Sequence, residues 1–181
     1  MPISRKYKFD AKCMNEKKQK YLNMKNLFYS ILFLSAVGFA QKQMPNVELG
    51  SVSGDSFNVS TDYNEEDKLY VFSFWATWCA PCINELDAIH QKYNDWKEKL
   101  NVEIIAVSVD DTRTQKRVKP LLNGKNWSYS VLLDTNQELK RALSIVNVPY
   151  TIVVKNKKIV YVSNGYSQGS EDELYAKLQE L

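Results

Sequence analysis

The sequence predicts an α/β domain in which helices flank a central mixed β-sheet. Apolar segments of strand length alternate with segments whose apolar residues recur every three or four positions, a pattern typical of a layered α/β fold. Residues 69–75 are almost continuously apolar, which predicts a central strand buried on both faces. Residues 81–100 repeat apolar side chains with helical spacing and predict a helix that packs on this sheet.

The segments before and after this strand and helix complete the first half of the domain. Short apolar stretches at 47–49 and 57–59, separated by glycines, predict an N-terminal β-hairpin. Residues 102–109 predict a second strand. The sequence Asp110-Asp111-Thr112 then offers N-caps for a short helix around residues 118–122, so a helical insertion is expected here.

The second half of the domain is expected to contain one more strand, a hairpin and two helices. Residues 129–133 are strand-like, and Asp134 with Gln137 resembles a capping arrangement for a helix that ends near residue 143. Residues 148–162 predict a hairpin around a polar turn at 155–157. Ser170 and Glu173 predict a capping box for the last helix.

Residues 1–40 predict a leader that precedes the domain at 41–181. A basic segment is followed by a short apolar run at 27–40, which has the length of a signal-peptide core and ends in the small residues Gly38 and Ala40. The run is short for a membrane span, which needs about 20 residues, although a retained N-terminal membrane anchor is the alternative. Met24 begins a compact signal sequence, so we expect either Met1 or Met24 to be the true start.

Charge is divided unevenly between these two parts. Residues 1–40 carry a net charge of +6, and residues 41–181 carry −3. The domain therefore shows no basic surface of the kind that binds nucleic acids.

The domain contains one cysteine pair, Cys79 and Cys82, because Cys13 lies in the leader. The spacing permits a tight, reversible disulfide, and a thiolate at the start of a helix is stabilised by the helix dipole. A bridge that closes so small a loop adds little stability, so a purely structural disulfide is disfavoured. A closed zinc site needs four ligands, and His90 is the only histidine, so no metal or cofactor is expected.

The motif at 74–82, Phe-Trp-Ala-Thr-Trp-Cys-Ala-Pro-Cys, together with Val148-Pro149-Tyr150-Thr151, resembles the thioredoxin superfamily. The leader, the early hairpin and the insertion resemble its TlpA/ResA-like extracytoplasmic branch, and the likeness covers about residues 44–181. It implies a thioredoxin-like fold and thiol–disulfide exchange.

The resemblance assigns roles to individual residues. Cys79 is expected to be the exposed nucleophile and Cys82 the buried resolving thiol. Glu85 stands where this branch often has an acidic residue, nearly one helical turn past Cys82, and is expected to hold a proton that tunes Cys82. An ordinary solvated glutamate is the alternative.

The resemblance also predicts a substrate-binding surface. It implies a cis peptide bond before Pro149, which would present the Val148 backbone to a substrate peptide. Trp78 is expected either to cover the site or to pack in the core, whereas Trp75 is expected to be a core residue.

Two positions depart from the family pattern. Ser73 stands where thioredoxin has a buried aspartate, so a proton relay must use another group, and Glu85 is the candidate. Asp87 stands where the family often has a proline that kinks the helix, which predicts a straighter helix and an added negative charge near the site unless the side chain points to solvent. His90 is expected to lie on the surface or on the helix flank.

The sequence therefore predicts a periplasmic or otherwise extracytoplasmic thiol–disulfide oxidoreductase that exchanges disulfides with protein partners. Ala80-Pro81 carries no charge between the cysteines, which favours a reductant, for example in cytochrome c maturation. A membrane-bound electron donor would then re-reduce it, and the chain itself would touch the membrane only through an uncleaved leader.

The sequence leaves three other functions open. The fold also suits a non-catalytic thioredoxin-like binding module. A thiol peroxidase would need Pro and Thr/Ser where the chain has Phe72 and Ala76, and metal delivery would need a wider cysteine spacing.

Overall fold

The computed structural model describes residues 42–181, and the leader with its predicted signal peptide lies outside the described residues. Seven strands form one mixed sheet in the order β2-β1-β5-β4-β3-β6-β7. The strands are β1 (Glu48–Ser51), β2 (Ser56–Asn58), β3 (Leu69–Trp75), β4 (Val102–Ser108), β5 (Ser130–Leu133), β6 (Tyr150–Lys155) and β7 (Lys158–Asn164). The helices are α2 (Ala80–Lys99), the 3-10 helix η1 (Gln115–Arg117), α3 (Val118–Asn123), α4 (Glu138–Ala142) and α5 (Ser170–Glu180).

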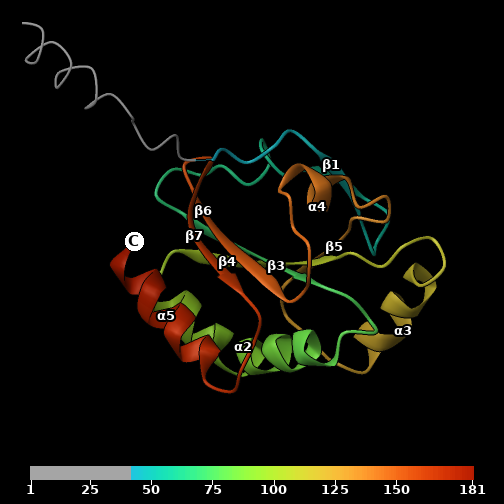
Figure 1. Ribbon diagram of the computed structural model, residues 1–181. Coiled ribbons are helices and arrows are strands. Elements are labelled where there is room, and N and C mark those ends of the chain that lie inside the picture. Colours follow the sequence, from blue (N-terminus) through green and yellow to red (C-terminus); the bar gives the residue numbers. More distant parts are fainter. Residues whose placement is uncertain (1–41) are drawn as a thin grey trace, which may run out of the picture. The chain divides into compact units, whose positions relative to one another are not determined.

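This arrangement confirms the predicted mixed sheet flanked by helices. Figure 1 shows α2 and α5 on one face of the sheet and α4 on the opposite face. Within residues 42–181, no helix combines the length and the apolar character needed to cross a membrane.

Strand β3 is the centre of the sheet, and all seven of its residues are buried. It pairs in parallel with β4, where Trp75 lies opposite Ser108, and antiparallel with β6, where Ser73 lies opposite Thr151. A strand with neighbours on both edges and helices on both faces has no contact with water, which explains its nearly continuous apolar sequence.

Helix α2 packs its apolar face on the sheet, and α5 packs beside it. Leu86 and Ile89 of α2 are fully buried, and burial of each stabilises the fold by roughly 2 kcal/mol. Trp96 of α2 stacks on Tyr175 of α5 with ring centroids 5.4 Å apart. The two helices thus form one layer, which continues from the cysteine motif to the C-terminus (Figure 1).

The two hairpins differ in how their turns are made. β1 and β2 pair antiparallel with Leu49 opposite Phe57, at the position where the sequence predicts the first hairpin. The β6–β7 hairpin turns at Asn156 and Lys157, which have φ values of 51° and 64°. Two consecutive residues with positive φ are typical of the tight turn that matches the twist of antiparallel strands.

Both predicted capping boxes are wrong in detail. Asp134 does cap α4, since its carboxylate accepts the N–H groups of Leu139 and Lys140, but the Gln137 side chain donates to the Val109 carbonyl instead. Helix α5 begins after Gly169, whose φ of 97° suits a residue without a Cβ, so Ser170 is not its N-cap. The carboxylate that reaches back to the Gly169 N–H belongs to Glu171 and not to Glu173.

The helical insertion forms as expected, although only one of the proposed caps serves it. Asp111 accepts the N–H groups of Arg113 and Thr114 just before η1. Asp110 is buried and turns instead toward the loop that leads to the cysteines. This difference brings Asp110 into the functional site.

Candidate active site

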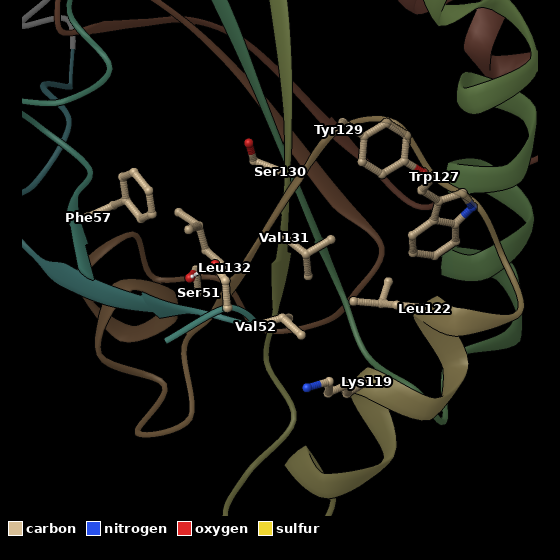
Figure 2. Close-up of a pocket in the computed structure, with 11 residues that line it drawn as sticks. Ser51, Val52, Phe57, Lys119, Leu122, Trp127, Tyr129, Ser130, Val131 and Leu132 are labelled. Carbon is tan, nitrogen blue, oxygen red and sulfur yellow. Dashed lines mark hydrogen bonds between the residues drawn. The ribbon is translucent and has the colours of Figure 1, made fainter. Parts of the chain in front are cut away.

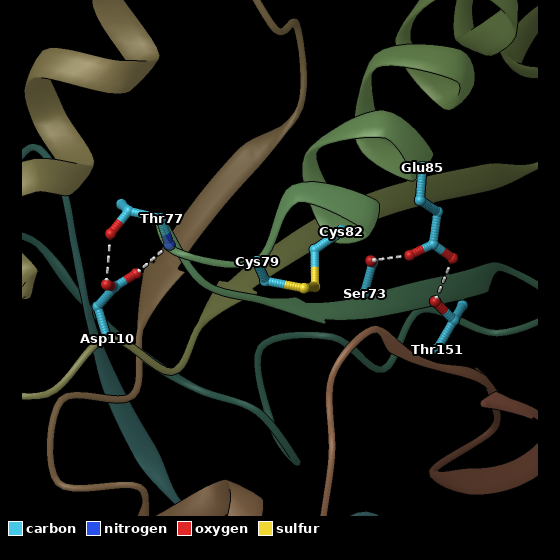
Figure 3. Close-up of a disulfide and its surroundings, with 7 residues drawn as sticks. All are labelled: Ser73, Thr77, Cys79, Cys82, Glu85, Asp110 and Thr151. Atoms are coloured by element: carbon cyan, nitrogen blue, oxygen red, sulfur yellow. Dashed lines mark hydrogen bonds between the residues drawn. A yellow bond between two sulfur atoms is a disulfide. The ribbon is translucent and has the colours of Figure 1, made fainter. Parts of the chain in front are cut away.

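The cysteine pair lies where β3 passes into α2. Cys79 is the N-cap residue of α2, and its carbonyl accepts the Ile83 N–H at 3.2 Å. Pro81 occupies the first turn of the helix, where a missing N–H costs nothing. Cys79 and Cys82 form a disulfide with their Cα atoms 5.3 Å apart (Figure 3).

The two cysteines differ in accessibility, but by less than expected. Cys79 is 5% exposed and Cys82 is 0% exposed. The prediction of an exposed nucleophile is therefore corrected, since Cys79 is itself largely buried in the disulfide form. The order is as expected, because Cys79 is the cysteine that solvent can reach.

Glu85 lies one turn after Cys82 on the buried face of α2 and is only 6% exposed. Its carboxylate accepts hydrogen bonds from the Thr151 hydroxyl at 3.0 Å and from the Ser73 hydroxyl at 3.4 Å (Figure 3). Burial raises the pKa of Glu85 to about 7, and the two hydroxyl donors oppose only part of this rise. The alternative of an ordinary solvated glutamate is therefore excluded by its burial.

Thr151 is a partner of Glu85 that sequence reasoning missed. The sequence shows Ser73 only as a departure from the family pattern. In the structure the hydroxyls of Ser73 and Thr151 both donate to the Glu85 carboxylate. They do so because Ser73 and Thr151 lie directly opposite each other in the antiparallel β3–β6 pair. Each of these two apolar strands contains one small hydroxyl residue, which is a visible signal in the sequence. The register that places the two residues opposite each other is not visible there, so the sequence alone does not pair them.

Asp110 is a second missed residue, on the other side of the disulfide. It is 1% exposed and accepts the Thr77 N–H at 2.8 Å, the Thr77 hydroxyl at 2.7 Å and the Ser108 hydroxyl at 2.9 Å. Figure 3 shows the disulfide between the Thr77–Asp110 pair and the Ser73–Glu85–Thr151 cluster. The carboxyl ends of the parallel strands β3 and β4 meet at this edge, which explains why a residue just after β4 reaches the loop just after β3.

The predicted substrate-binding residues lie in contrasting environments. The Val148–Pro149 peptide bond is cis, as the resemblance implies, and the Pro149 carbonyl accepts the Gly165 N–H at 2.9 Å. Trp78 is 58% exposed, so the alternative in which it packs in the core is wrong. Trp75 is fully buried, as expected, with its ring edge-on to Trp127 at 5.3 Å.

Asp87 and His90 stand apart from the cysteine chemistry. Asp87 pairs with Lys125 and accepts the Trp127 indole N–H at 2.9 Å. Its carboxylate is therefore directed at these two side chains, and Lys125 compensates the negative charge that the sequence places near the site. His90 is partly buried and packs edge-on against Tyr129 at 6.3 Å, which fits the helix-flank prediction.

An open hollow of about 510 Å³ lies between the β1–β2 hairpin, β5 and α3 (Figure 2). Its walls are mostly apolar, with Phe57, Leu122 and Val131 among them, and Lys119 is its charged side chain. Neither cysteine nor Glu85 lines it, so it is not part of the disulfide site. Within the described part of the chain, no three His, Cys, Asp or Glu side chains gather in a way that could hold a metal ion.

Comparisons with known proteins agree with this geometry. The model of the AhpC/TSA family matches residues 40–163. The chain is 27% identical to the thiol-disulfide oxidoreductase ResA of Bacillus thuringiensis subsp. konkukian over 137 residues, which are 75% of this chain and 76% of that protein.

Solved structures give the same result. A thioredoxin-like protein from Porphyromonas gingivalis is 40% identical and superposes with a TM-score of 0.67, covering 76% of this chain and 90% of that one. StoA from Bacillus subtilis superposes with a TM-score of 0.58 at 19% identity, covering 73% of this chain and 99% of that one, which supports the fold.

Proposed function

Because the chain belongs to the AhpC/TSA family, we propose that it is a reductant of disulfide bonds in exported proteins. Its class is that of a thioredoxin-like thiol-disulfide oxidoreductase.

The observation that carries the proposal is the disulfide at the start of α2 with a buried carboxyl one turn away. In the reduced protein, the Cys79 thiolate attacks one sulfur of a partner disulfide, and the partner's second sulfur leaves as a thiolate that takes up a proton. Cys82 then gives its proton to Glu85 and attacks Cys79 in the mixed disulfide, and the partner's first sulfur leaves as a thiolate that takes up a proton from solvent. The products are the Cys79–Cys82 disulfide and a partner with two thiols, so two electrons have moved to the partner and its two protons have come from solvent.

Glu85 serves this cycle as the proton partner of Cys82. A carboxyl whose pKa is raised to about 7 by burial is close to evenly divided between its two forms at neutral pH. It therefore accepts the Cys82 proton during oxidation and returns it during re-reduction at little energetic cost. Trp78 and the Val148 backbone bind the partner beside the disulfide.

A reducing role is supported by the dipeptide Ala80-Pro81, which places no charge or histidine between the cysteines to favour the thiolate strongly. The predicted signal peptide or anchor supports an extracytoplasmic location. A protein that reduces partners there needs a membrane-bound electron donor, and cytochrome c maturation is one setting that uses such a reductant.

A trapping experiment tests the proposal. Cys82→Ser is expected to accumulate mixed disulfides through Cys79 in the native cell envelope, and mass spectrometry identifies the partners. Cys79→Ser/Cys82→Ser is the matched control and should trap none. Failure of the Cys82 variant to trap any protein, together with no reduction of insulin by the unmodified protein plus a dithiol, would instead favour a non-catalytic binding module.

A further inference from the structure

The open hollow between the β1–β2 hairpin, β5 and α3 is one part of a longer groove. A second hollow of about 410 Å³ adjoins it, and the two share Val52 and Lys119 in their walls. The first hollow is lined by Leu132 and the second by Leu133, which are consecutive residues of β5. Together they form a groove along this strand, which we call the β5 groove.

Apolar side chains with part of their surface exposed are concentrated in the β5 groove. The partly buried residues that pack against the core and line the groove are Val52, Phe57, Leu122, Trp127, Val131 and Leu133. Figure 2 shows Leu122 on α3 and Val131 on β5 extending into the space between these two elements. Single exposed apolar residues are ordinary on a protein surface, whereas a contiguous group of them marks a binding surface.

The edge of β5 is only partly covered beside this groove. β1 pairs with β5 only through Gly50 and Ser51. The chain then turns back at once, since the Gly54 N–H donates to the Ser51 carbonyl at 3.2 Å. Among the strands that the structure describes, none continues the pairing beside Ser130 and Val131 on this side. An uncovered strand edge of this kind can pair with an extended segment of another chain.

The charged side chains of the groove are positive, although residues 41–181 as a whole carry −3. Lys119 lines both hollows, Lys116 lines the second, and both lysines are exposed. No acidic residue of the described chain lines either hollow or forms an ion pair with either lysine. The occupant that complements these walls therefore combines apolar and acidic side chains. The leader does not meet this requirement, because residues 1–40 carry +6.

We propose that the β5 groove is a docking site for an extended segment of a protein partner, in which apolar side chains alternate with acidic ones. Alternate side chains of an extended segment point to opposite faces. The apolar face of the segment contacts Leu122 and Val131, and its backbone pairs with the uncovered edge of β5. Its acidic side chains face away from this apolar floor, toward Lys116 and Lys119.

The proposed site has a defined end and is separate from the cysteines. Glu48 and Glu138 line the hollow that adjoins the groove at Leu133, so an acidic segment is repelled beyond this point. Neither Cys79 nor Cys82 lines the groove. The proposal therefore goes beyond the reducing role and does not depend on it.

Peptide binding to the oxidised protein tests the proposal. The probe is a short fluorescent peptide without cysteine in which valine alternates with glutamate, and its reference is the same peptide with lysine in place of glutamate. Fluorescence anisotropy should show that the glutamate peptide binds at least about tenfold more tightly, because complementary charge selects between the two. In NMR spectra of the backbone N–H groups, the signals of Leu122 and Val131 should move on binding, and those of Cys79 and Cys82 should not.

Variants of the groove separate charge from apolar contact. Lys119→Glu should weaken binding of the glutamate peptide about fivefold, and Lys116→Glu/Lys119→Glu should bind the lysine peptide more tightly than the glutamate peptide. A reversed preference cannot arise from a general loosening of the fold. Leu122→Ala should weaken both peptides about equally, because it removes apolar contact area. Arg117→Glu is the matched control, since Arg117 is exposed in the same segment but lines neither hollow, and its effect should stay below about twofold.

Other results would overturn the proposal. These are no binding of the glutamate peptide, movement of signals only outside the groove, or an equal effect of Arg117→Glu and Lys119→Glu. If dodecanoate moves the signals of Leu122 and Val131 and the peptides do not, the groove binds a small amphiphile instead. If the same signals move with protein concentration alone, the occupant is a second copy of this chain. The peptide measurements need no thiol exchange, so this proposal and the reducing role fail in different experiments.

Discussion

Asp110 accepts hydrogen bonds from both the backbone N–H and the hydroxyl of Thr77, two residues before Cys79. A charged acceptor buried at this point holds the loop between β3 and α2 in one conformation. The Ser108 hydroxyl, at the end of β4, donates to the same carboxylate and orients it. Asp110 therefore positions the first cysteine indirectly, through Thr77 in the loop that precedes it.

Asp110→Asn should slow the reaction of reduced Cys79 with iodoacetamide several-fold and lower the free energy of unfolding by about 2 kcal/mol. The amide replaces one acceptor oxygen with a donor, so a buried hydrogen bond to a charged group is lost. Stopped-flow alkylation and urea denaturation measure the two effects.

Asp134→Asn is the control for this variant. Asp134 is equally buried and also follows a strand, but its partners are the N–H groups of Leu139 and Lys140 in α4. A similar loss of stability with unchanged Cys79 alkylation is expected. Equal slowing in both variants would mean that Asp110 acts only through general stability.

Glu85 makes the stability of the oxidised protein depend on pH. Its pKa is raised by burial from 4.5 to about 7, so between these values the folded protein holds a proton that the unfolded chain has lost. The stabilisation is complete below pH 4.5 and is lost as the pH rises through about 7. The change is about 3 kcal/mol on the scale of 1.36 kcal/mol per pKa unit.

Denaturation of the oxidised protein at several pH values measures this change. Glu85→Gln should remove most of the slope between pH 4.5 and 7, because the amide does not titrate. A slope of the same size in the variant would show that other groups cause it.

Thr151→Val removes a donor that stabilises the Glu85 carboxylate. The hydroxyl lowers the pKa of Glu85 against the effect of burial, so its loss should raise that pKa further. The pH profile of Cys82 alkylation in the reduced protein should then shift to higher pH. Ser73→Ala should cause a smaller shift, since the Ser73 bond is 3.4 Å long and the Thr151 bond is 3.0 Å. The reverse order would count against Thr151 as the main partner of Glu85.

Strand β3 and the two cysteines of the site can be predicted from the sequence because their signals are local. β3 is predicted at its observed bounds, since a seven-residue apolar run needs no knowledge of its neighbours. Cys79 and Cys82 are adjacent in the chain to the strand and helix that position them. Local patterns of this kind are sufficient for such elements.

The site positions of Asp110 and Thr151 could not be predicted because they depend on contacts between distant segments. Thr77 and Asp110 are 33 residues apart, and Glu85 and Thr151 are 66 apart. The capping boxes fail for a local reason, since Gln137 and Gly169 adopt left-handed backbone conformations that change which side chain faces the helix start.

Trp78 is expected to bind protein partners and to contribute little to folding. At 58% exposure it has little contact area to lose, so Trp78→Ala should change the free energy of unfolding by less than about 0.5 kcal/mol. A tryptophan in the centre of an interface often contributes about 2 kcal/mol or more, so KM for a trapped partner should rise at least about tenfold. Alkylation of Cys79 by iodoacetamide, which needs no docking surface, should be unchanged.

Val162→Ala, which shortens another exposed apolar side chain on β7, should leave KM as it is. An equal rise in KM for both variants would mean that the partner recognises exposed apolar surface in general, and an unchanged KM in Trp78→Ala would remove Trp78 from the binding site.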